Sequence, residues 1–90
     1  MGVHVVWNTI RDAKRKRILE RAVVEAIGNR PSSGHWDVKL TECDALPGWT
    51  AVVVAPDRTR VAWYFEGQGI DDDPELVRLR IEILLRVVTP

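Results

Sequence analysis

An apolar run framed by two turn signals is the feature that most limits how this chain can fold. Residues 49–55 are apolar on both faces of an extended chain, as in a strand at the centre of a sheet. Pro47-Gly48 precedes the run and Pro56-Asp57 follows it, and both dipeptides are typical of turns. Within the first turn we expect Gly48 to take a positive φ. The run therefore predicts a central strand with a short connection at each end.

The segments on either side of this run have the alternating side-chain pattern of half-exposed strands. Apolar and polar residues alternate in residues 37–41 before the run, and larger side chains alternate in residues 61–66 after it. Residues 3–7 show the same alternation near the N-terminus. These patterns predict a three-stranded antiparallel meander that is preceded by one short strand.

A helix is predicted between the first strand and the meander. Thr9 and Asp12 have the spacing of a capping box, which places the helix start at Asn8 or Thr9. Gly28 is expected to take the left-handed conformation that ends the helix, and residues 29–35 predict a loop. The core stripe of this helix follows the i, i+3, i+4, i+7 spacing and consists of Leu19, Ala22, Val23, Ala26 and Ile27.

Residues 75–88 carry two patterns at once. Asp73-Pro74-Glu75 combines an N-cap residue, a first-turn proline and an acid, which is a specific helix start. Apolar residues from Val77 to Val87 also alternate with period two, as in a long strand. We predict a helix, because its start signal is the more specific one, and keep the long strand as the alternative. In a helix Arg80 should pair with an acid or reach solvent along its own stem.

Together these elements predict a single α+β domain over residues 1–90. The order is strand, helix, three-stranded antiparallel meander and C-terminal helix, an αβββα-like arrangement with the helices on one face of an antiparallel sheet. A chain of 90 residues holds one hydrophobic core and not two. Its apolar fraction of 46% and charged fraction of 29% are those of a folded globular chain.

Charge, cysteine and hydropathy exclude several classes of protein. Thirteen basic and thirteen acidic residues cancel, so no overall field draws the chain to nucleic acid or to an anionic membrane. The single cysteine, Cys43, cannot close an internal disulfide, which favours a reducing compartment. Cys43, His4 and His35 do not have the sequence spacing of metal ligands, so we expect no metal site and no cofactor. Without a membrane-spanning run or a signal peptide, we expect a cytoplasmic protein.

No set of residues predicts an enzyme. Ser33, His35 and Asp37 would share one side of an extended segment, but a hydrolase triad also needs a preorganised oxyanion hole, and this glycine-containing loop offers neither rigidity nor an evident nucleophile turn. The acids of residues 71–75 lack the ligand spacing of a calcium loop and are interpreted as a helix cap. We therefore predict no catalytic residue.

A basic segment supports an alternative function. Six of the thirteen basic residues lie within eleven positions at the start of the first helix. On a helix they form either a solvated face or a surface that binds nucleic-acid phosphates. Residues 66–75 hold five acids, which are expected to pair with this basic segment within one chain or between copies. The candidate phosphate-binding residues are Arg11, Lys14, Arg15, Arg17 and Arg21.

Excess apolar surface leads to the main functional hypothesis. Trp63 and Tyr64 point to opposite faces of one strand, and the C-terminal helix is apolar around about two-thirds of its circumference. One small chain cannot bury all of this area. We therefore predict a non-enzymatic interaction module that forms a homodimer and can bind another protein. Nucleic-acid binding is the alternative, and a small-ligand pocket floored by tryptophans is a further one. The predicted interface residues are Trp63, Tyr64, Ile81, Leu84, Leu85 and Val88.

Overall fold

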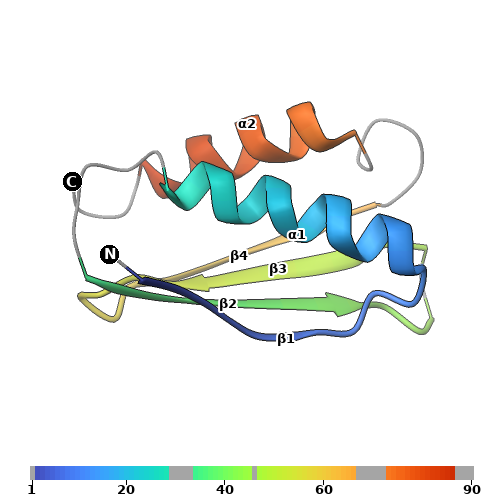
Figure 1. The fold of residues 1–90 in the computed structure, drawn as a ribbon, viewed down its shortest axis with the longest axis horizontal. Coiled ribbons are helices and arrows are strands. Elements are labelled where there is room, and N and C mark those ends of the chain that lie inside the picture. The colour runs from blue at the N-terminus through green and yellow to red at the C-terminus, as the bar shows by residue number, and fades with distance from the viewer. Residues whose placement is uncertain (1, 29–33, 46, 67–72, 87–90) are drawn as a thin grey trace.

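The computed structural model describes residues 2–28, 34–45, 47–66 and 73–86. Figure 1 shows two helices packed side by side on one face of a four-stranded sheet. This confirms the predicted α+β class and the order of elements, with a helix and not a long strand near the C-terminus. The elements are β1 (Gly2–Asn8), α1 (Ala13–Gly28), β2 (His35–Glu42), β3 (Trp49–Val54), β4 (Arg60–Phe65) and α2 (Pro74–Leu85).

The sheet is mixed, so the prediction of an antiparallel sheet is wrong for β1. Its strand order is β1-β2-β3-β4, and β2, β3 and β4 form the predicted antiparallel meander. β1 runs parallel to β2, because α1 lies between them in the chain and carries it back before β2 begins. The register of β1 shifts between Val5 and Trp7, whereas β4 pairs with β3 in an unbroken register.

The hydrophobic core lies between the helices and the sheet. Alternate residues of β2 and β3 turn toward the helices, and Trp49 stacks on Phe65 of β4 with ring centroids 4.3 Å apart. The five residues predicted as the stripe of α1 are all buried, which confirms that stripe. The strands and α2 contribute Trp36, Val38, Leu40, Trp49, Ala51, Val53, Phe65, Val77, Ile81 and Leu85.

α1 begins at Ala13, so the predicted start at the Thr9 end of a capping box is wrong. Asp12 is the residue that caps the helix, and its carboxylate accepts the backbone N–H of Arg15 at 3.0 Å. The hydroxyl of Thr9 instead accepts the backbone N–H of Glu42 at 3.0 Å. Thr9 is therefore committed to the end of β2 and is not available to start a helix.

The two glycines predicted to have positive φ do not have it. Gly28 is the last residue of α1, and neither it nor Gly48 takes a left-handed conformation. Gly48 is needed for space, because a Cβ there would overlap the carbonyl oxygen of Phe65. In the described residues positive φ occurs at Gly34, with φ 128°, and at Arg58, with φ 75°, just after the confirmed Pro56-Asp57 turn.

Candidate interaction surface

α2 is apolar on two different sides. Val77 and Ile81, together with Leu85, face the core and are buried. A second stripe, at spacings i, i+3 and i+7, faces away from the core. Its side chains are Leu76, Leu79 and Ile83, with 38%, 47% and 57% of their surface exposed.

This helical phase corrects part of the predicted interface. Ile81 and Leu85 are buried in the core of their own chain, so their prediction as interface residues is wrong. Leu84 is half-buried and packs against the same core, and Val88 lies outside the described residues. An alternating apolar pattern does not show which side of a helix turns inward, because that depends on how the helix docks on the sheet.

Trp63 and Tyr64 lie on opposite faces of β4, as predicted. Trp63 pairs with Ala51 and so lies on the face that the helices cover, yet 38% of its surface is exposed because β4 is at the edge of the sheet. The Arg80 guanidinium of α2 lies 5.7 Å from the centroid of the Trp63 ring, which is the geometry of a cation–π contact. Arg80 is exposed, in agreement with the prediction for a helix. Trp63 therefore contacts α2 through Arg80, whereas Tyr64 lies on the face of the sheet that the helices do not cover.

The outer edge of β4 completes this surface. Both β1 and β4 are edge strands of the described sheet. The register shift in β1 is the kind of irregularity that discourages pairing with a further strand, whereas a regular edge such as β4 favours it. We call Leu76, Leu79, Ile83, Trp63 and the outer edge of β4 the α2/β4 surface.

Two residues of the basic segment, Arg11 just before α1 and Arg15 within it, pair with acids of the same chain. Arg11 forms an ion pair with Asp44, and its backbone N–H donates to the Glu42 carboxylate at 2.7 Å. Arg15 Nη1 lies 3.3 Å from the other oxygen of Glu42. The Arg11 hydrogen bond, with the charges of Arg15 and Arg11, holds the pKa of Glu42 below its usual 4.5, although burial acts to raise it. Two of the five predicted phosphate-binding residues are thus engaged at the end of β2.

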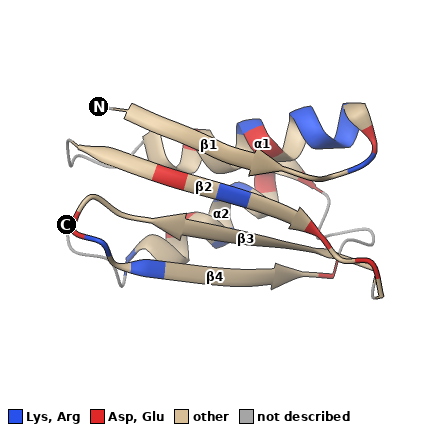
Figure 2. Cartoon of the chain, turned by 90° about the horizontal axis from the view of Figure 1, so that it is seen from below, with Lys and Arg blue, Asp and Glu red and all other residues tan. Residues whose placement is uncertain are grey.

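The nucleic-acid hypothesis consequently depends on fewer residues. Lys14, Arg17 and Arg21 remain exposed on α1. Figure 2 shows basic residues along the first part of that helix. Residues 67–72, which include two of the five acids expected to face the basic segment, lie outside the described residues. Glu75 is 3.9 Å from Arg78 of its own helix. The pairing of the two segments therefore stays a prediction.

A groove of about 510 Å³ lies between α1 and α2. Its walls carry charges of both signs, and no tryptophan of the described residues lines it. Trp36 and Trp49 are buried in the core. This groove is therefore not the tryptophan-floored pocket of the further alternative. Its charged lining residues are Arg17, Arg21, Glu25, Glu75 and Arg78.

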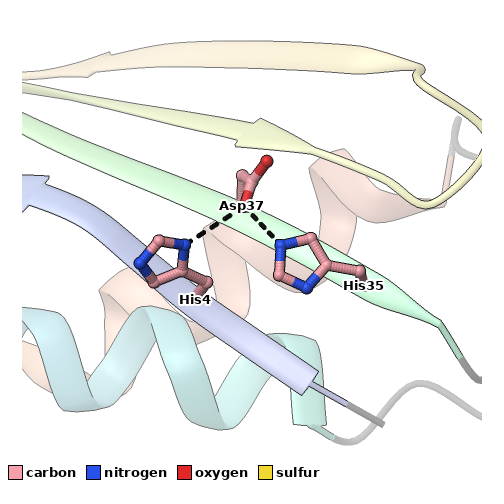
Figure 3. Close-up of side chains that lie close together, drawn as sticks. All are labelled: His4, His35 and Asp37. Carbon is pink, nitrogen blue, oxygen red and sulfur yellow. Dashed lines mark hydrogen bonds and ion pairs between the residues drawn. The ribbon is translucent and has the colours of Figure 1, made fainter.

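A side-chain cluster on the uncovered face of the sheet was missed by the sequence analysis. His4 of β1 lies opposite Asp37 of β2 in the parallel register, and His35 lies on the same face. Figure 3 shows the three side chains directed toward one another. The loop predicted for residues 29–35 is wrong for His35, which begins β2, and Ser33 lies outside the described residues. The His-x-Asp spacing was visible in the sequence, but its alignment with His4 required the strand register.

Comparisons with protein-family models, curated proteins and solved structures find no match to this chain. In the part of the chain that the structure describes, neither helix has the length and apolar character needed to cross a membrane.

Proposed function

We propose that this protein is a non-enzymatic interaction module that forms a homodimer through the α2/β4 surface. The observation that carries the proposal is the exposed stripe of α2, where Ile83 has 57% and Leu79 has 47% of its surface exposed. The same helix contacts Trp63 of the regular edge strand β4 through Arg80. Apolar side chains that adjoin at such an edge are typical of association sites, and tryptophan is a frequent anchor in them.

A two-fold dimer uses every part of this surface. Antiparallel pairing of β4 with β4 of a second copy extends the sheet and supplies backbone hydrogen bonds to both edges. When the pairing is centred on Trp63, Arg60 lies opposite Glu66 of the second copy, so the charges at the two ends of the paired strands are complementary. A two-fold axis perpendicular to the sheet keeps all helices on one face, where the two exposed stripes of α2 meet and are removed from water.

Light scattering behind a sizing column tests this proposal. The wild-type protein should have twice the mass of one chain, and the double variant Leu79→Glu with Ile83→Glu should have the mass of one chain. Both residues are exposed, so this variant should keep the circular dichroism of the folded wild type. Val6→Glu is the matched control, because Val6 is 39% exposed on the other edge strand. It should leave the dimer intact.

Two results would contradict the proposal. One is a wild-type protein with the mass of a single chain across a wide range of concentration. The other is a dimer that survives the α2 double variant and dissociates with Val6→Glu, since that outcome would place the interface at β1.

A further inference from the structure

Two imidazoles and one carboxylate converge on the uncovered face of the sheet (Figure 3). His35 Nε2 lies 2.8 Å from Asp37 Oδ1, and His4 Nδ1 lies 3.6 Å from the same oxygen. One ligand atom from each of the three residues lies within 4.8 Å of the other two. The imidazole rings have centroids 6.0 Å apart and are tilted by 43°.

The parallel pairing of β1 with β2 builds this cluster. Its register places His4 beside Asp37 and Gly2 beside His35. A Cβ at Gly2 would lie 3.8 Å from Nδ1 of His35, so the absence of a side chain there leaves that side of the ring open. His35 and Asp37 are two residues apart on one strand and therefore share a face. The three side chains come together only when the two strands are paired.

The donor set and its spacing are those of a zinc-class ion. Imidazole nitrogen and carboxylate oxygen bind zinc at about 2.0–2.2 Å, so ligand atoms of a tetrahedral site lie about 3.3 Å apart. The separations of 2.8 Å and 3.6 Å between each histidine nitrogen and the Asp37 oxygen fall on either side of that value, and the two histidine nitrogens lie within 4.8 Å of each other. The side chains are 61%, 65% and 36% exposed for His4, His35 and Asp37, so small rotations are enough to bring the set around an ion.

We propose that His4, His35 and Asp37 bind one divalent transition-metal ion of the zinc class. Three protein ligands leave a fourth position for water or for a group of another molecule. The ion would join the N-terminal strand to β2 and would stabilise the folded chain, because the unfolded chain lacks the assembled site. The cluster lies on the β1/β2 side of the sheet and the α2/β4 surface at the opposite edge, so this inference is independent of the dimer proposal.

Competition for zinc against a chromophoric chelator tests the proposal. The measurements use the full chain with Cys43→Ser, since a thiolate also binds zinc. We expect one zinc ion per chain, and we expect Asp37→Asn and His35→Gln each to weaken the affinity by on the order of tenfold or more. Asp44→Asn is the matched control, because it removes the same charge beyond the other end of β2. It should leave the affinity unchanged.

Two further readouts separate this site from non-specific binding. Zinc should raise the thermal midpoint of the Cys43→Ser chain and should not raise that of the Asp37→Asn variant. Cobalt in place of zinc should give a visible spectrum without a thiolate-to-metal band, even when Cys43 is present. The proposal is overturned if the chain binds no zinc at one equivalent, or if Asp44→Asn weakens binding as much as Asp37→Asn does.

Discussion

Gly48→Ala tests how tightly the β2/β3 connection closes on β4. A Cβ at this position would overlap the carbonyl oxygen of Phe65, and it would lie 2.6 Å from the hydroxyl oxygen of Tyr64. That hydroxyl donates a hydrogen bond to the carbonyl oxygen of Pro47 at 3.3 Å, and Gly48 itself accepts the backbone N–H of Cys43 at 2.9 Å. The added methyl group therefore meets both a side chain and the backbone of β4.

The expected loss of stability is large for a single methyl group. Overpacking in a close-packed site costs about 1–3 kcal/mol, and this site belongs at the upper end because the Phe65 oxygen is part of a paired strand. In a domain of this size, each kcal/mol shifts the thermal midpoint by about 4–8 °C. We therefore expect Gly48→Ala to lower the midpoint by on the order of 10–20 °C.

Thermal unfolding followed by circular dichroism measures this shift, with Gly28→Ala as the matched control. A Cβ at Gly28 has no heavy atom of the described residues within 4 Å, and Gly28 is helical. Its replacement by alanine should therefore be neutral or should stabilise by up to about 1 kcal/mol. A Gly48→Ala midpoint as high as that of Gly28→Ala would refute the reasoning, since it would mean that β4 yields to the methyl group without cost.

Substitutions at three other positions probe contacts elsewhere in the chain. Glu42→Gln should destabilise by about 1.5 kcal/mol at neutral pH in urea unfolding, because it removes a charged hydrogen-bond acceptor. Since folding lowers the pKa of Glu42, the stabilisation by its carboxylate is present above the usual pKa of 4.5 and is lost as the pH falls through the lowered pKa. A difference in unfolding free energy between variant and wild type that does not change with pH would contradict this prediction. Arg58→Val should destabilise by about 1 kcal/mol and Arg58→Gly should not, because φ at this position is 75°, which glycine adopts freely and a β-branched residue does not. Equal thermal midpoints for the two variants would argue against backbone strain at this position. Leu85→Ala should cost about 2–5 kcal/mol in urea unfolding, because this side chain is fully buried, and a cost near zero would show that α2 does not pack on the core through Leu85.

Local chemistry was sufficient to predict the elements and much of the core. The apolar stripe of α1 has helical spacing within one segment, and every member of it is buried. The cap at Asp73 decided between helix and strand for the C-terminal segment, and its carboxylate accepts the N–H of Glu75 at 2.9 Å as an N-cap does. The alternation along β4 also sufficed to place Trp63 and Tyr64 on opposite faces.

The candidate sites depended on contacts that no local pattern contains. Which apolar side of α2 turns inward was decided by its docking on α1 and the sheet, so Ile81 became core while Ile83 became surface.

The sequence by itself therefore determined which segments form helices and strands, because hydrogen-bonded turns, caps and apolar periodicity act over a few neighbouring residues. Only the tertiary structure decided strand direction, register and helix phase. The parallel register of β1 with β2 brings His4 to Asp37 across more than thirty positions of sequence, and a shift of one residue would turn one of them to the other face. Register is set by burial and by pairing between distant segments, which is why the clustered ligands and the α2/β4 surface emerge only from the assembled fold.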